Sequence, residues 1–70
     1  MAEKSTYKVI ELVGSSEVSW EDAAKKAVET AAKTLKELRI AEVVEQDMKL
    51  EAGKVVMYRT RLKLSFKYEE

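Results

Sequence analysis

The chain has 70 residues, with 13 basic and 13 acidic side chains that give a formal net charge of zero at pH 7, and it contains no cysteine and no histidine. A zero net charge argues against nucleic-acid binding, which rests on an excess of basic residues. The missing residue types exclude disulfides, thiol chemistry and the commonest general base and zinc ligand. We therefore expect a single domain over residues 1–70 that is not an enzyme.

No segment of the sequence suits a membrane or a secretion signal. Its apolar runs are much shorter than the roughly 18 residues of a membrane span, and the polar N-terminus lacks the apolar core of a signal peptide. The sequence thus predicts a cytoplasmic protein.

The first half of the chain predicts a strand followed by a helix. After a loosely held start at residues 1–6, Tyr7–Val13 is rich in β-branched and apolar residues and ends at a loop signal, Gly14-Ser15-Ser16. Ser19 is a suitable N-cap, and apolar residues then recur at spacings of three and four over residues 20–38. This spacing predicts one helix whose apolar stripe is mostly alanine, so the surface that packs against it should approach closely.

A β-hairpin is expected next, with a strand at about Ile40–Leu50, a turn at residues 51–54 and a long strand at residues 55–68. The last strand alternates between two faces. One face carries Val56, Tyr58, Thr60, Leu62, Leu64, Phe66 and Tyr68, and the other carries Arg59, Arg61, Lys63 and Lys67. Because the strands on either side of the helix run parallel, the third must lie between them in an antiparallel sheet. The predicted fold class is α+β, a β-α-β-β subunit with a three-stranded antiparallel sheet packed around one helix.

A two-residue turn at Ala52-Gly53 fixes the expected register of the hairpin. The pairs it predicts are Ala41 with Leu64 and Val43 with Leu62 on the helix-covered side, and Glu42 with Lys63, Gln46 with Arg59 and Met48 with Met57 on the other. These pairs match apolar with apolar and acid with base, which supports the register. A bulge in so long a ribbon would shift it by one position.

The last strand is too long for this chain to cover by itself. At about 14 residues it exceeds the usual five to six, and a chain of this size buries only a modest fraction of its surface. With no disulfide available, association of identical chains is the remaining means of stabilisation.

With these elements the sequence resembles the dodecin family over nearly its whole length. The segments that carry the resemblance are Tyr7–Ser16, the alanine-rich helix, Ala41–Gln46, Tyr58-Arg59-Thr60 and Ser65-Phe66. The resemblance implies a hollow homododecamer that binds a small ligand, which in the best-known members is a flavin such as FMN or riboflavin. Flavin-binding members carry a stacking tryptophan where this chain has Ile40, and a glutamine where it has Arg59. These changes, with Val-Ser-Trp-Glu at residues 18–21 and Val-Glu-Gln-Asp-Met at residues 44–48, are more similar to a subfamily described as calcium-binding.

The candidate sites leave alternatives open. Ile40, Gln46 and Arg59 are the expected ligand-binding residues, because a guanidinium beside an amide suits an anionic or planar molecule, although Arg59 also suits an ion pair with a neighbouring acid. Glu45 and Asp47, two positions apart on one strand face, are the expected ligands of a calcium ion.

Two further segments have a functional and a structural interpretation. The loop at residues 14–16 suits either anion binding at the helix start or ordinary capping. The basic residues of the last strand suit either a polyanion or a salt-bridged interface. Two functions therefore remain: small-ligand storage, or a flavin-free shell that binds calcium or other cations or is chiefly structural.

Overall fold

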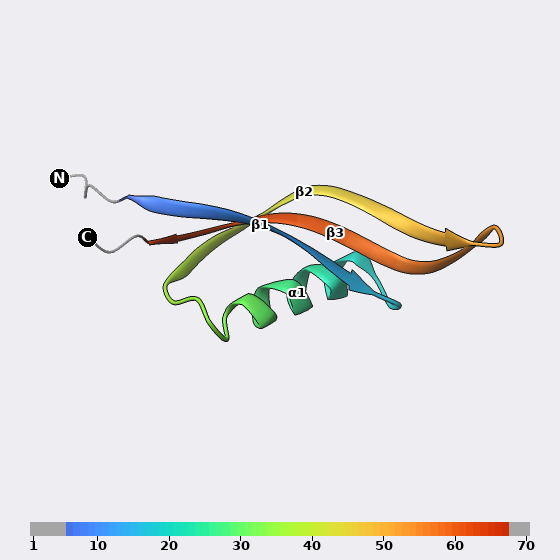
Figure 1. The fold of residues 1–70 in the computed structure, drawn as a ribbon, viewed down its shortest axis with the longest axis horizontal. Coiled ribbons are helices and arrows are strands. Elements are labelled where there is room, and N and C mark those ends of the chain that lie inside the picture. Colours follow the sequence, from blue (N-terminus) through green and yellow to red (C-terminus); the bar gives the residue numbers. More distant parts are fainter. Residues whose placement is uncertain (1–5, 68–70) are drawn as a thin grey trace.

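The computed structural model describes residues 6–67, so most of the expected loose start and Tyr68 lie outside the described part of the chain. Its elements are β1 (Tyr7–Ser16), α1 (Trp20–Ala31), β2 (Leu38–Glu51) and β3 (Lys54–Lys67). The strands form one antiparallel sheet in the order β1-β3-β2, and α1 lies on one of its faces (Figure 1). The predicted β-α-β-β order and the central position of β3 are confirmed.

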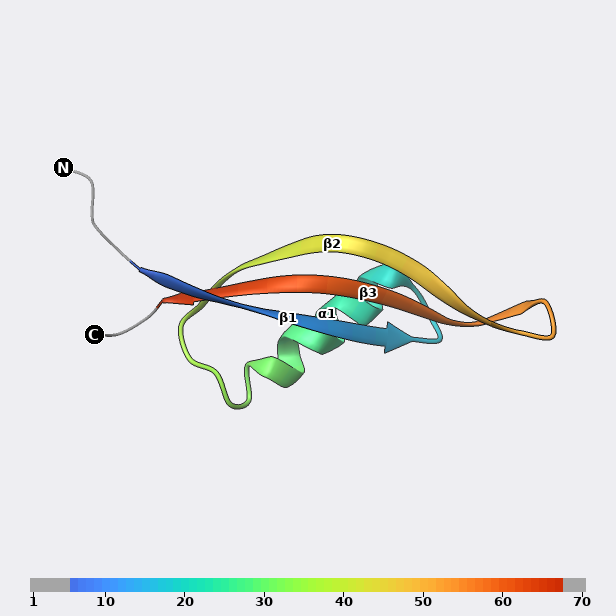
Figure 2. The same ribbon diagram turned by 45° about the horizontal axis from the view of Figure 1, so that its top comes forward.

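The helix covers only part of this sheet. It packs on β1 and β3 and hardly touches β2, while the β2–β3 hairpin extends well past the helix at one end (Figure 2). The described molecule is accordingly elongated, with extents of 55 × 21 × 15 Å. Within residues 6–67 no helix has both the length and the apolar character needed to cross a membrane.

The helix is shorter than predicted and ends at Ala31. The backbone N–H groups of Thr34 and Leu35 donate to the Ala31 carbonyl in a terminal turn, and Glu37 has a φ of 63°, which no right-handed helix accommodates. The expectation of helix at residues 32–38 was therefore wrong. Leu38, which continued the helical spacing, is instead the first residue of β2.

Residues 14–16 do not form the predicted loop but continue β1. Gly14 pairs with Thr60 and Ser16 with Tyr58, because β1 follows the long β3 past the apolar segment. Gly14 is required here by close packing: a Cβ atom at this position would lie 2.2 Å from the Ala23 carbonyl oxygen and 2.9 Å from the Ala27 Cβ. The close approach expected from the alanine stripe is confirmed.

The predicted hairpin register holds beside the turn and at the far end of the hairpin, and is shifted in the middle. The three pairs involving Ala41, Glu42 and Val43 are confirmed. The pairing is irregular between Val43 and Glu45 and again between Lys49 and Leu50. Residues 45–49 are therefore displaced by one position relative to β3. The predicted pairs of Gln46 with Arg59 and of Met48 with Met57 were therefore wrong; the observed pairs are Gln46 with Thr60, Asp47 with Arg59, Met48 with Tyr58 and Lys49 with Met57.

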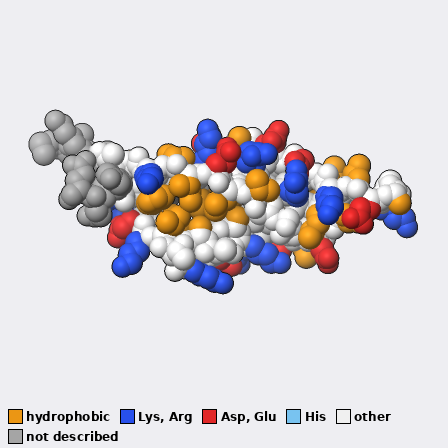
Figure 3. Space-filling view, viewed as in Figure 1, with side chains coloured by type: hydrophobic (Ala, Val, Ile, Leu, Met, Phe, Trp, Pro, Cys, Tyr) orange, Lys and Arg blue, Asp and Glu red, His pale blue; other side chains and the backbone are white. Residues whose placement is uncertain are grey.

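Few side chains in the described chain are buried. The buried apolar residues of this part are three alanines of α1 and two leucines of β3: Ala23, Ala27, Ala31, Leu62 and Leu64. By contrast Ile40 is 64% exposed, and Val43, which lies on the helix side as predicted, is still 52% exposed because α1 does not reach over β2. Apolar side chains also gather where β1 passes beside α1 (Figure 3). A single chain thus leaves much of its apolar surface in water.

Candidate functional site

The face of the sheet opposite α1 is lined by ion pairs, and we call it the charged face. Thr60, Leu62 and Leu64 of β3 are buried beneath the helix, so the alternate residues Arg59 and Arg61 lie on the other side. There Arg61 bridges all three strands: its Nη1 lies 3.5 Å from Oε1 of Glu11 on β1, and its Nε 3.3 Å from Oε1 of Glu45 on β2.

Arg59 makes a two-point ion pair with Asp47. Its Nε donates to Oδ1 at 2.7 Å and its Nη2 to Oδ2 at 2.8 Å. These bonds, together with the positive charges of Arg59 and Arg61, lower the pKa of Asp47 below its usual 3.8, and the same pair raises the pKa of Arg59. Two cations of the predicted basic strip are therefore neutralised by acids of the same chain, which favours the salt-bridged interpretation over a polyanion site.

Glu45 and Asp47 lie on the same face, two positions apart, as the sequence predicted. Their hard carboxylate oxygens are the donor type that calcium prefers. Calcium takes about six to eight oxygens, however, and two carboxylates supply at most four. In the described part of the chain no three acidic side chains come close enough together to hold a metal ion. The donor type therefore fits calcium, but a complete ligand set would need oxygens from other copies or from water.

The three expected ligand-binding residues are not brought together within one chain. Ile40 pairs with Ser65, six positions along β3 from Arg59, which corresponds to about 20 Å at the usual rise per residue. Gln46 pairs with Thr60, on the helix side of the sheet rather than the charged face. A ligand that touched both Ile40 and Arg59 would have to do so across two copies of the chain.

The start of α1 is capped by side chains of the same chain. Ser16 Oγ donates to Oδ2 of Asp22 at 2.6 Å and accepts from the Val18 N–H at 2.9 Å, while Ser19 Oγ accepts from the Asp22 N–H at 3.0 Å. The Ser16 bond first, and then Lys26, lower the pKa of Asp22 below 3.8. Asp22 thus supplies the negative charge that the helix N-terminus favours, which supports capping over binding of an external anion.

This network predicts a specific acid sensitivity. Because the pKa of Asp22 is lower in the folded chain, its contribution to stability is complete above about pH 4 and is lost as the pH falls through the lowered value. We expect Asp22→Asn to lower the melting temperature at neutral pH and to flatten its fall in acid, measured by circular dichroism. The control Glu21→Gln removes a carboxylate from the same turn without touching this network. Parallel pH curves for wild type and Asp22→Asn would contradict the assignment.

Trp20 joins the helix start to the strand that carries the candidate calcium ligands. Its Nε1 donates to the Asp47 backbone carbonyl at 2.9 Å, and its ring meets Tyr58 edge to face at 5.1 Å. The buried Thr60 hydroxyl donates to the Trp20 carbonyl at 2.9 Å. These contacts give Trp20 a packing role between the helix and the sheet. Its bond to Asp47 had no signal in the sequence, since the two residues are 27 positions apart.

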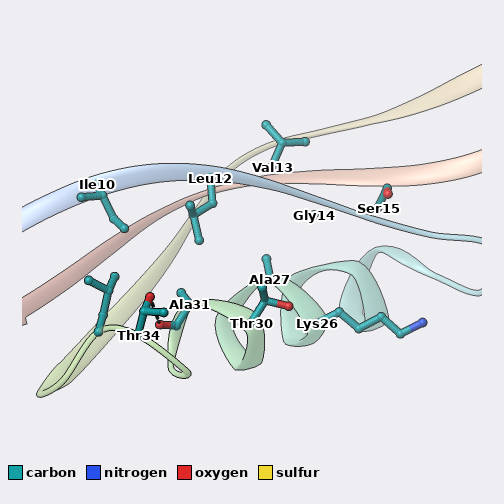
Figure 4. A pocket seen from close by; sticks show the side chains of 11 residues that line it. Ile10, Leu12, Val13, Gly14, Ser15, Lys26, Ala27, Thr30, Ala31 and Thr34 are labelled. Atoms are coloured by element: carbon teal, nitrogen blue, oxygen red, sulfur yellow. Dashed lines mark hydrogen bonds between the residues drawn. The ribbon is translucent and has the colours of Figure 1, made fainter.

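An apolar groove of about 640 Å³ runs between β1 and α1. Ile10 and Leu12 point from β1 toward the helix, where Ala27 and Ala31 form the facing wall (Figure 4). In the described part of the chain β1 is an edge strand of the sheet, so the backbone groups along its outer side have no strand partner there. The groove and the edge together form one more surface that a single chain leaves open.

Comparison with known proteins supports the resemblance found in the sequence. The Dodecin family profile matches residues 6–69. This chain belongs to the dodecin family. It is 44% identical over 63 residues, 90% of this chain and 89% of the other, to a protein of Mycobacterium tuberculosis named Calcium dodecin.

Solved dodecin structures have the same fold. The dodecin of Streptomyces coelicolor matches with a TM-score of 0.91 and 36% identity over 99% of both chains. The calcium dodecin of M. tuberculosis, described as calcium-chelating with a novel calcium-binding site, matches with a TM-score of 0.83 and 43% identity over 93% of both chains. The predicted similarity to the calcium-binding branch of the dodecins is thereby confirmed.

Two positions distinguish this dodecin from the flavin-binding pattern expected from the resemblance. Ile40 is a large apolar residue on the charged face but offers no aromatic ring for stacking. Arg59 has no acceptor atom, and its guanidinium is held by Asp47. Neither side chain supplies the stacking or amide contact that a flavin would use there.

Proposed function

We propose that this dodecin assembles into a homododecameric shell in the cytoplasm that binds calcium through carboxylates of the charged face, with no catalytic role. The assembly is supported by the small buried core, the open groove beside β1 and the exposed apolar residues such as Ile40. A chain of this size would be marginal alone, and copies that covered these surfaces would supply the missing burial.

The observation that carries the calcium assignment is the adjacent placement of Glu45 and Asp47 on the charged face of a chain 44% identical to a protein named Calcium dodecin. Two carboxylates from one chain are too few, so the proposal requires that copies meet at a symmetry axis and pool their oxygens. Flavin storage receives less support, because Ile40 and Arg59 lack the chemistry that a flavin ring would need.

Calcium titration by calorimetry tests the proposal. We expect heat of binding for the wild-type assembly and at least a tenfold loss of affinity in Glu45→Ala, Asp47→Ala, because each subunit then loses both candidate ligands. Glu29→Gln on the exposed side of α1 is the matched control and should bind like wild type. Unchanged heats in the double variant would remove these residues as ligands.

A flavin titration of the same sample separates the two candidate functions. We expect a colourless protein that does not quench added riboflavin or FMN, whereas a yellow protein or strong quenching would favour storage of a flavin.

A further inference from the structure

Arg59 and the proposed calcium ion would use the same two oxygen atoms. Both Oδ1 and Oδ2 of Asp47 accept hydrogen bonds from Arg59, at 2.7 and 2.8 Å. The contact of Arg61 with Glu45 is weaker by geometry, since it involves Oε1 alone at 3.3 Å and Arg61 is shared with Glu11. Of the two candidate ligands, Asp47 is therefore the one whose oxygens must first be released.

The surroundings allow this exchange without unfolding. The Arg59 side chain is 46% exposed and that of Asp47 is 42% exposed, so the guanidinium can leave into water rather than through packed atoms. The Asp47 backbone stays fixed by the bond from Trp20 Nε1 to its carbonyl oxygen at 2.9 Å. Release of Arg59 would thus free a carboxylate whose position on β2 remains defined.

From this geometry we infer that Arg59 is an internal competitor for the cation site, which holds Asp47 in the absence of a divalent ion and sets the affinity with which one binds. The inference rests on the proposed calcium function and adds the residue that regulates the calcium affinity of the site. A divalent cation offers two charges and several coordination positions to the carboxylate, whereas a monovalent ion offers one charge and little gain over the guanidinium. A divalent ion therefore displaces the guanidinium at a lower concentration than a monovalent ion does.

Calorimetric titration with calcium tests the inference on the intact assembly. Removing the competitor in Arg59→Gln is expected to raise calcium affinity about fivefold, the amount that corresponds to a favourable exposed ion pair. Arg59→Lys keeps the charge but loses the planar two-point contact, and should give a smaller rise. The matched control is Lys49→Gln, because Lys49 lies two positions from Asp47 on β2 but contacts Glu51, at 3.8 Å. It should change the affinity by less than about twofold.

The outcomes separate the inference from the function on which it rests. Equal affinities for wild type and Arg59→Gln would overturn the inference and leave the calcium function standing. An equal rise in Lys49→Gln would also overturn it, because the effect would then come from net charge alone. If neither wild type nor Arg59→Gln bound calcium, both would fall. Trp20 fluorescence reports on the bond from its indole N–H to the Asp47 carbonyl. In the absence of calcium it should be the same in wild type and variants, which verifies that the fold is retained.

Discussion

Gly14→Ala is expected to destabilise the fold by about 3 kcal/mol or more, because overpacking against atoms that cannot move has costs of this order. The added Cβ would lie 2.2 Å from the Ala23 carbonyl oxygen, which belongs to the helix backbone and cannot rotate away. α1 would have to move off β1, and the apolar groove between them would change shape. Denaturant unfolding followed by circular dichroism, at one fixed protein concentration, measures the effect.

Ser15→Ala is the matched control for this substitution. Ser15 is the next residue of β1, is exposed and points to the other face of the sheet. Its replacement should change the free energy of unfolding by no more than about 0.5 kcal/mol. Stability of Gly14→Ala equal to that of Ser15→Ala would contradict the close packing of β1 and α1.

Leu62→Ala should reduce the free energy of unfolding by about 2–5 kcal/mol, the range for buried leucines. Leu62 is 1% exposed and, among residues 6–67, is one of two leucines buried beneath α1. With so few buried side chains there is little neighbouring material to fill the resulting space. Thermal and denaturant unfolding at fixed protein concentration would measure the loss.

Leu62→Met distinguishes the loss of volume from a general intolerance of change. Methionine has a similar volume and is flexible, so its cost should stay below about 1.5 kcal/mol. Equal losses for the alanine and methionine variants would show that the volume of Leu62 is not what stabilises the core.

The sheet could be predicted because its signals are local. The alternation along β3 separates Arg59 and Arg61 from Leu62 and Leu64, and this separation is the one in the structure. The crossover helix and the turn at Ala52-Gly53 then fix the strand order and one end of the register. These features depend on residues close together in the chain, where elementary rules of periodicity and turn geometry are strong.

The end of the helix and the loop at residues 14–16 were predicted wrongly because tertiary contacts decide them. Leu35 and Leu38 continue the helical spacing, and no glycine or proline marks the end after Ala31. Gly14 has the composition of a loop, but its place in β1 is required by a helix that approaches within contact distance. Neither fact is visible in the neighbouring residues.

At the candidate site the sequence predicted which acids of β2 share a face, but not which of them meets Arg59. Glu45 and Asp47 could be placed on one face of their strand, but the expected register put Gln46 opposite Arg59, which assigned the two acids to the face opposite Arg59. Two irregularities in the β2–β3 register place Asp47 opposite Arg59 instead. Their positions depend on the pairing energies along the whole hairpin. The bond from Trp20 to Asp47 likewise depends on the finished fold.

The central proposal is that other copies of the chain cover the exposed apolar residues beside β3, and the mass of the particle in solution tests it most directly. Twelve copies of an 8.0 kDa chain weigh about 96 kDa. Light scattering coupled to size-exclusion chromatography should give this mass, unchanged on dilution to low micromolar concentration. A well-folded particle of 8.0 kDa would contradict the account, because the proposed shared calcium site would then have only one chain's carboxylates.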